Sequence, residues 1–217
     1  VCSSDLGFGN AWDEGNIRID DNFLRALIEG NVLGATASSF TDPGAGTRTA
    51  GANILPRGAD DGIVRNNLIG FSQSGGILMG CGAGTPNTTG WLIENNEIRG
   101  SGIGSNNADG IGLESGAGNE TIRGNLIWES DATGLDTWTG TGNNLIENNT
   151  FTRNGIGTAV TDETMAIVLY NNAETVRRNI IFQNYGTGVV VLGTGSQNTI
   201  SENSIYDNGT ILNNEIG

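Results

Sequence analysis

Carboxylate and aromatic side chains recur at one position of three short apolar segments in this sequence. The segments begin at Ile111, Leu135 and Ile167, and the third residue after each is, in turn, Glu114, Trp138 and Tyr170. Asp136 adjoins this set, one residue after Leu135. An aromatic ring can pack on the apolar face of a sugar while carboxylates hold its hydroxyl groups. Trp138 and Tyr170 are therefore candidate substrate-binding residues.

The expected separation of Glu114 and Asp136 suits the hydrolysis of a glycosidic bond. If the three segments are neighbouring strands with their first residues inward, both acids point outward, offset by one strand and two residues. Strand spacings of ~4.8 Å and ~3.3 Å then place their backbones roughly 8 Å apart. The carboxyl groups of inverting glycoside hydrolases, one an acid and the other a base, are ~6.5–9.5 Å apart. Glu114 and Asp136 are therefore candidate catalytic residues.

A repeated phrase, aliphatic-x-x-Asn-x-apolar, indicates which elements must position these residues. Its asparagines are Asn31, Asn67, Asn96, Asn125, Asn149, Asn179 and Asn203. Successive asparagines are 36, 29, 29, 24, 30 and 24 residues apart, which are periods typical of solenoids. A second phrase, usually glycine followed by an aliphatic residue, recurs between them, as at Gly110-Ile111 and Gly134-Leu135. The chain is therefore predicted to form stacked coils.

The repeat predicts short β-strands joined by bends. Alternating aliphatic residues, as in Ile167-Val168-Leu169, place every second side chain on one face of a strand. The two aliphatic residues of the asparagine phrase are five positions apart, an odd separation that requires a bend at the asparagine. Stacked coils place these asparagines ~4.8 Å apart, so their amides can form a hydrogen-bonded ladder. Leucine-rich and helical repeats fit less well, because leucine is not dominant and the 36 glycines disfavour helix.

This pattern resembles the right-handed parallel β-helix repeats of the pectate-lyase-like superfamily over almost the whole chain. The resemblance implies an all-β fold, a right-handed single-stranded parallel β-helix (solenoid) of about seven to eight coils. Such a repeat encodes packing and not chemistry, so the resemblance is specific for the fold and weak for an activity.

A shorter motif, Asn107-Ala-Asp109-Gly, resembles the Asn-Thr-Asp-Gly motif of polygalacturonases. This second resemblance implies that Asp109 is catalytic, with Asp136 as the counterpart of the acids in the following coil. The Gly-His-Gly and Arg-Ile-Lys motifs of that family are missing, because the chain has no histidine and no lysine.

Lyases and uronate epimerases of this superfamily need basic residues, and the groove is expected to offer only isolated arginines such as Arg99 and Arg153. These two arginines are further candidate substrate-binding residues. If the protein is an enzyme, a polysaccharide-active glycoside hydrolase is slightly preferred over a lyase or an epimerase.

Insertions predict a groove beside the acidic and aromatic residues. The step from an asparagine to the next aliphatic phrase is 10 residues in the shortest coils, but 15 after Asn96, 18 after Asn149 and 23 after Asn31. These three insertions leave one corner of the coil, and a fourth, between Gly80 and Gly90, leaves another part. A row of loops along one edge can form the wall of a groove. The alternative is that this turn tolerates insertions, so that the loop length varies without a functional role.

Charge and hydrophobicity narrow the range of partners. The net charge is −14, and the ten arginines are scattered along the chain, which argues against nucleic acid and disfavours polyanionic substrates. The apolar runs are far shorter than the ~20 residues of a membrane span, so no span is expected. We expect a secreted or cell-surface protein that binds or processes a polysaccharide or other glycan. The alternative is a noncatalytic structural or adhesive surface scaffold, and no feature predicts an oligomeric state.

No cofactor or metal site is predicted. Calcium could bind the acidic pairs Asp20-Asp21 and Asp60-Asp61, because it prefers oxygen ligands. It requires several such ligands, however, and two adjacent acids are more often a solvated turn.

Residues 7–217 are predicted to form one β-helix domain. Residues 1–6, Val-Cys-Ser-Ser-Asp-Leu, look like the translation of a sequencing adapter and are treated as non-native. The chain ends shortly after a further coil has begun, whereas solenoids usually end in a capping element. Residues 7–217 are therefore expected to be an internal fragment of a longer protein.

Overall fold

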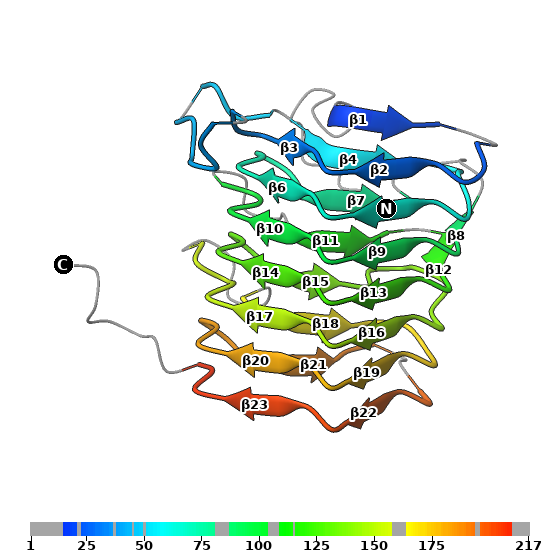
Figure 1. The fold of residues 1–217 in the computed structure, drawn as a ribbon. Helices are drawn as coiled ribbons and strands as arrows, with labels where there is room; N and C mark the ends of the chain where they lie inside the picture. The colour runs from blue at the N-terminus through cyan, green and yellow to red at the C-terminus, as the bar shows by residue number, and fades with distance from the viewer. Residues whose placement is uncertain are drawn as a thin grey trace.

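The structure is a computed structural model that describes residues 15–20, 23–36, 38–44, 46–49, 51–80, 87–103, 109–114, 116–157, 164–193 and 196–209. Every regular element in these residues is a β-strand, and the strands form three sheets of seven strands and one of two. The three large sheets are parallel, and the chain visits them in turn through seven coils (Figure 1). The expected all-β parallel β-helix is thereby confirmed.

Each coil contributes one strand to each large sheet, named here sheets A, B and C in chain order. Sheet A contains β1 (Gly15–Ile19), β4 (Ala52–Pro56), β7 (Ile77–Met79), β11 (Ile111–Leu113), β15 (Leu135–Asp136), β18 (Ile167–Leu169) and β21 (Val189–Val191). Sheet B contains β2 (Leu27–Glu29), β5 (Ile63–Arg65), β9 (Leu92–Glu94), β13 (Thr121–Arg123), β16 (Leu145–Glu147), β19 (Thr175–Arg177) and β22 (Thr199–Ser201). Sheet C contains β3 (Val32–Leu33), β6 (Leu68–Gly70), β10 (Glu97–Arg99), β14 (Leu126–Trp128), β17 (Thr150–Thr152), β20 (Ile180–Phe182) and β23 (Ser204–Tyr206). The small sheet pairs β8 (Thr88–Thr89) with β12 (Ala117–Gly118).

Equivalent residues of successive coils are stacked, which gives the molecule a continuous core. In sheet A the residues paired in this way are Ile77, Ile111, Leu135 and Ile167. All four are fully buried in one hydrophobic cluster, together with residues of the other sheets such as Ile122 of β13 and Ile127 of β14. Aliphatic side chains from three sides therefore fill each coil, and their removal from water is the main stabilising contribution.

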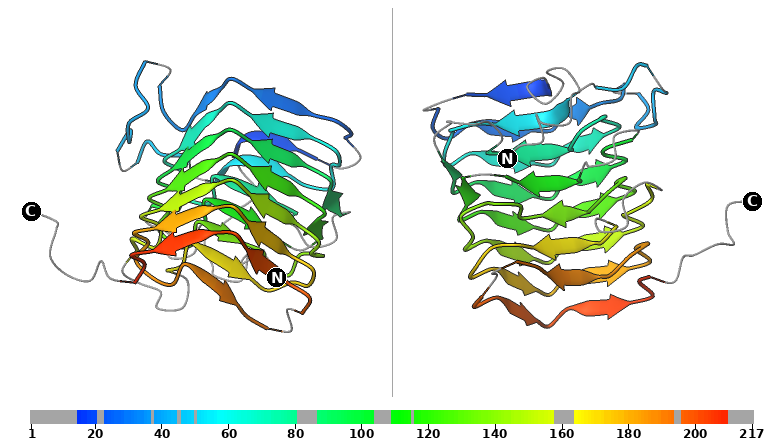
Figure 2. Two further views of the ribbon diagram at one scale, coloured as in Figure 1. Left: turned by 60° about the horizontal axis from the view of Figure 1, so that its bottom comes forward. Right: turned by 180° about the vertical axis from the view of Figure 1, so that it is seen from behind.

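Each coil bends at residues with a left-handed backbone conformation. One of them directly precedes each ladder asparagine, for example Asn148 (φ 55°) before Asn149. Others lie five residues earlier and five residues later, for example Asn143 (φ 62°) and Arg153 (φ 53°). Asparagine tolerates this conformation better than most residues do. The regular spacing of these bends gives sheets B and C their constant angle to one another (Figure 2).

The predicted asparagine ladder forms at the bend between sheets B and C. The side-chain Nδ2 of each asparagine donates to Oδ1 of the next asparagine in the stack at 2.9–3.1 Å, from Asn31 through to Asn203. The backbone N–H of each asparagine donates to the same oxygen. Because most of these amides are buried, the ladder satisfies polar groups that water cannot reach.

Two further ladders lie five residues to either side of the first one, and neither was predicted from the sequence. The second follows sheet C. Its side-chain amide hydrogen bonds join Asn154 to Asn184 at 3.0 Å and Asn184 to Asn208 at 2.8 Å, and the backbone N–H of Ser130 donates to Oδ1 of Asn154 at 3.2 Å. Ser72, Ser101 and Ser130 occupy the same position in earlier coils, where their hydroxyl groups do not continue the ladder. The third precedes sheet B and contains Glu120, Asn144, Glu174 and Asn198. The fixed five-residue offset from the first ladder was the signal that could have revealed them.

A glycine directly precedes several strands of sheet A, as Gly110 precedes β11, and close packing requires it there. A Cβ atom on Gly110 would lie 2.6 Å from the carbonyl oxygen of Gly134 and 2.6 Å from Cγ2 of Ile127. It would also lie 3.0 Å from Oγ of Ser130 in the second ladder. Any larger residue would therefore push sheets A and C apart.

Candidate functional site

The outer face of sheet A carries the acidic and aromatic residues identified from the sequence. Ile111, Leu135 and Ile167 point into the core, so the residues one and three positions later point outward. Gly112 of β11 pairs with Asp136 of β15, which pairs with Val168 of β18. The predicted offset of Asp136 from Glu114, one strand and two residues, is therefore present in the structure.

Two carboxyl groups lie close to Gly112. A Cβ atom on this glycine would lie 3.7 Å from Oδ2 of Asp109 and 3.7 Å from Oε1 of Glu114. These two oxygens are therefore separated by no more than twice that distance, while Asp136 occupies the adjacent strand. Cδ1 of Leu78, from the preceding coil, would lie only 2.7 Å from the same Cβ atom, so the side chain of Leu78 fills the space beside Gly112.

The three candidate acids of sheet A are partly withdrawn from water. Asp109 is 8% exposed and Asp136 is 9% exposed, whereas Glu114 is half-buried. Oδ1 of Asp109 accepts a hydrogen bond from the backbone N–H of Thr133 at 3.1 Å, which fixes its orientation. Desolvation strengthens the hydrogen bonds that these carboxylates can offer to a ligand.

Trp138 and Tyr170 form one aromatic unit on the same face. Their ring centroids are 4.7 Å apart and their planes meet at 80°, an edge-to-face arrangement. Trp138 is 37% exposed. Thr137 holds the pair in place, because its Oγ1 accepts from the backbone N–H of Tyr170 at 3.0 Å and its carbonyl oxygen accepts from Nδ2 of Asn171.

The structure does not bring Arg99 and Arg153 to this face. Arg99 lies in β10 of sheet C and Arg153 directly follows β17. Both guanidinium groups bind Glu129, at 2.9 Å and 2.6 Å, and both lie over the ring of Trp128, at 4.1 Å and 4.9 Å from its centroid. The expectation that they belong to the groove is corrected, because strands of sheet C present their outward side chains to a different side of the solenoid.

One of the predicted insertions can be followed over most of its length. The loop between β3 and β4 projects from the corner between sheets C and A (Figure 1). Phe40 of this loop packs against Phe71 with ring centroids 5.3 Å apart, and Arg48 forms an ion pair with Asp42 at 2.5 Å. Residues 81–86, 104–108 and 158–163 of the other insertions lie outside the described residues, as do residues 1–6 and Asn107 of the polygalacturonase-like motif.

Two of the four acids considered for calcium, Asp20 and Asp60, bind nearby residues of the protein. Asp20 forms an ion pair with Arg18 at 2.8 Å, while Asp21 lies outside the described residues. Oδ1 of Asp60 accepts from the backbone N–H and the hydroxyl of Thr89, at 2.8 Å and 3.0 Å. In the part of the chain that the structure describes, no three His, Cys, Asp or Glu side chains are grouped in a way that could hold a metal ion.

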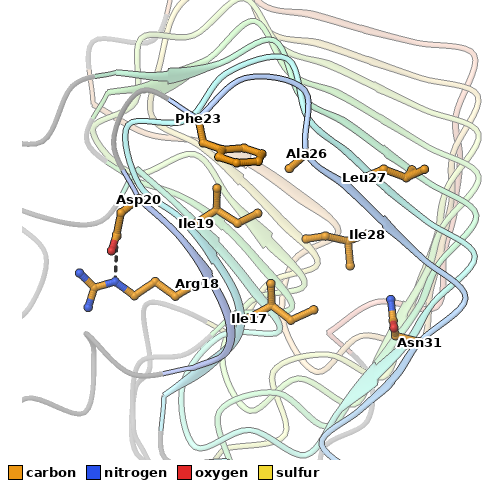
Figure 3. A pocket seen from close by; sticks show the side chains of 9 residues that line it. All are labelled: Ile17, Arg18, Ile19, Asp20, Phe23, Ala26, Leu27, Ile28 and Asn31. Carbon is orange, nitrogen blue, oxygen red and sulfur yellow. Dashed lines mark hydrogen bonds and ion pairs between the residues drawn. The ribbon is translucent and has the colours of Figure 1, made fainter.

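A pocket of about 500 Å³ opens within the first described coil (Figure 3). The inward-facing residues Ile17, Ile19, Ala26 and Ile28 line it, and the Arg18–Asp20 ion pair lies at its rim. The equivalent residues of later coils form the hydrophobic core, so this pocket is an end of the core and is separate from the acids near Gly112.

No helix of the described residues is long and apolar enough to span a membrane.

The stacked sheets and the internal ladders define the protein as a parallel β-helix. The family model described as a right handed beta helix region matches residues 29–205. Because this match covers most of the chain, the protein belongs to the right-handed β-helix family.

Solved structures with a similar fold include two bacterial proteins. One is an alginate lyase from Paenibacillus sp. str. FPU-7, at 12% identity and a TM-score of 0.46, with 89% of both chains covered. Another is PfbA, a surface adhesin of Streptococcus pneumoniae, at 14% identity and a TM-score of 0.49, covering 94% of this chain and 63% of the adhesin chain. No curated protein matches the sequence. Similarities this distant carry no information about activity.

Proposed function

We propose that this β-helix binds an extracellular polysaccharide, neutral or weakly charged, along the outer face of sheet A. The observation that carries this proposal is the Trp138–Tyr170 pair, in which Trp138 is exposed and Tyr170 is half-buried. Acids lie on the same sheet, Asp109 and Glu114 near Gly112 and Asp136 in the adjacent strand. One sugar would pack on the indole of Trp138, and hydroxyl groups of a neighbouring sugar would donate to Asp109, Glu114 or Asp136.

The distribution of charge supports a neutral or weakly charged polymer. From β7 to β21, the strands of sheet A and the three residues after each of them include no arginine, and the chain has no lysine. A polyanion would therefore meet the carboxylates of sheet A without compensating cations. Most arginines are instead found on other faces, for example Arg65, Arg123 and Arg177 on sheet B.

Hydrolysis is the reaction that these side chains could perform. In an inverting mechanism one carboxylic acid donates its proton to the glycosidic oxygen as the bond breaks. A second carboxylate removes a proton from the water molecule that attacks the anomeric carbon. Glu114 and Asp136 remain the proposed pair, and Asp109 lies near Glu114.

The first test measures binding of a panel of soluble polysaccharides to the protein and to Trp138→Ala. Loss of the exposed indole is expected to weaken binding of the preferred polymer about fivefold, because one aromatic contact contributes on the order of 1 kcal/mol. Trp128→Ala is the matched control, since it removes the same side chain from sheet C. Equal affinities of the protein and Trp138→Ala would contradict the proposed face.

The same panel separates binding from hydrolysis. If the domain is a hydrolase, new reducing ends appear with the unaltered protein and disappear with Glu114→Gln, while the variant still binds. Binding without new reducing ends would leave a carbohydrate-binding domain and remove the catalytic proposal.

A noncatalytic surface scaffold is the second candidate. The observation that favours it is the first ladder, which runs unbroken through all seven coils and makes the solenoid a stiff spacer. Absence of binding to every glycan of the panel would favour this reading.

A further inference from the structure

The third ladder differs from the other two because carboxyl groups alternate with amides in it. Its members Glu120, Asn144, Glu174 and Asn198 each directly precede a strand of sheet B, at the corner where the chain arrives from sheet A. Glu120 is 1% exposed and Glu174 is fully buried. Neither glutamate belongs to the face proposed to bind a glycan.

Both carboxyl groups act as hydrogen-bond acceptors within the stack. Oε2 of Glu120 accepts from the backbone N–H of Trp91 at 2.5 Å, and its Oε1 accepts from that of Gly118 at 3.2 Å. Oε2 of Glu174 accepts from the backbone N–H of Asn144 at 3.0 Å, and its Oε1 accepts from Nδ2 of Asn144 at 3.1 Å.

The backbone of each glutamate continues the ladder to the next coil. The N–H of Glu120 donates to Oδ1 of Asn144 at 2.8 Å, and the N–H of Glu174 donates to Oδ1 of Asn198 at 2.9 Å. These bonds do not depend on the charge of either carboxyl group. A glutamate therefore continues the ladder to the next coil through its backbone, whatever the ionisation state of its side chain.

No positive charge compensates these buried groups. Neither glutamate is paired with an arginine in the part of the chain that the structure describes. The charged group that acts on Glu120 is the carboxylate of Asp60, whereas Glu174 faces the amides of Asn144 and Asn198. An ionised carboxylate in such surroundings is destabilised, because it has lost its hydration without gaining a counter-ion.

The pKa values follow from this environment. Burial raises the pKa of Glu120 from 4.5 to about 8; the N–H groups of Trp91 and Gly118 lower it by less, and Asp60 adds to the rise. Burial likewise raises the pKa of Glu174 to about 7 against the smaller effect of the Asn144 donors.

We propose that the third ladder is a proton-controlled seam, in which the neutral acids of Glu120 and Glu174 hold the corner between sheets A and B together and their ionisation loosens it. Between the ordinary range of glutamate and the range of these two groups, the folded protein binds more protons than the unfolded chain. Stability is therefore greatest in acid, falls as pH rises from the ordinary range of glutamate to about 7 for Glu174 and about 8 for Glu120, and levels off above that range.

The test compares denaturant unfolding of the protein with that of the double variant Glu120→Gln/Glu174→Gln at several values between about pH 5 and pH 9. Glutamine keeps the acceptor oxygen and cannot ionise. Over this range the unfolding equilibrium constant of the unaltered protein is expected to rise at least about a hundredfold more than that of the double variant. Glu147→Gln is the control, because Glu147 is paired with Arg177 on the surface of sheet B.

Equal pH dependence in the protein and the double variant would overturn the proposal. If the double variant does not fold, ¹³C NMR of glutamate carboxyl groups in the unaltered protein provides an independent measurement. Two carboxyl resonances that titrate near neutral pH or above support the seam, and titration of every glutamate in its ordinary acidic range would refute it.

Discussion

Asn149 illustrates how one amide side chain joins three coils. Its Oδ1 accepts from the backbone N–H and Nδ2 of Asn125, at 2.9 Å and 3.0 Å. Its Nδ2 donates to the carbonyl oxygen of Ile122 at 2.9 Å and to Oδ1 of Asn179 at 3.1 Å. The side chain is buried, so water cannot replace these partners. Selection of asparagine at this bend is therefore a matter of hydrogen bonding as well as of turning the chain.

Replacement of Asn149 by alanine is expected to be strongly destabilising. The substitution leaves buried donors of Asn125 and the carbonyl group of Ile122 unsatisfied, at about 1–3 kcal/mol each. We expect a loss of about 3 kcal/mol or more in the free energy of unfolding, measured in urea. Asn203→Ala is the control, because Asn203 lies in the last described coil and is only partly buried, so that water can enter the space that its side chain leaves. Similar losses in both variants would show that burial does not govern the strength of the ladder.

The strands of sheet B show order on their outer face as well. One stacked column of this face alternates in charge through six coils: Glu29, Arg65, Glu94, Arg123, Glu147 and Arg177. Ion pairs at 2.8 Å join Arg65 to Glu29, Arg123 to Glu94, and Arg177 to Glu147. Like charges on adjacent strands are destabilising. The alternation therefore allows charged side chains to cover a sheet whose coils are ~4.8 Å apart.

Reversal of one charge in this column tests its contribution. Arg123→Glu places three carboxylates on successive strands and is expected to lower stability by about 1 kcal/mol at low ionic strength, with most of the loss removed by salt. Arg123→Gln removes the ion pair without adding repulsion and should have a smaller effect. Urea denaturation at two salt concentrations provides the measurement. If both variants lose the same stability at low salt, the alternation contributes nothing.

At the scale of the whole molecule, the coil is the unit of stability. In each large sheet, a strand is hydrogen-bonded to the strands of the coils before and after it. Stability should therefore be close to a sum of coils and of the interfaces between them. The insertions emerge between strands, so they change the surface without disturbing the stack.

Deletion of one complete coil tests this description. Asn179 and Asn203 are 24 residues apart, and removal of residues 179–202 would stack Asn203 directly on Asn149 while retaining Trp138 and Tyr170. We expect a folded β-helix with a lower melting temperature, observed by circular dichroism. Deletion of residues 179–190 is the control, because it interrupts the ladder and the core register. A whole-coil deletion that unfolds as completely as this control would contradict modular stability.

The sequence alone determined the coils, the first ladder and the outward set of Glu114, Asp136, Trp138 and Tyr170. These features depend on the periodic placement of aliphatic residues and asparagine, and each copy of a repeat is visible locally. The ladders of mixed composition escaped detection, because serine, asparagine and glutamate share a position only when the coils are stacked.

Only the tertiary structure decided which distant side chains share an environment. It brought Asp109 close to Glu114 near Gly112, separated Arg99 and Arg153 from them, and enclosed Glu120 and Glu174 away from water. The physical reason is that the inserted loops vary in length, so spacing along the chain does not report spacing across the sheets. Burial and the pKa of a buried acid depend on neighbours from other coils, and those neighbours come together only when the coils stack.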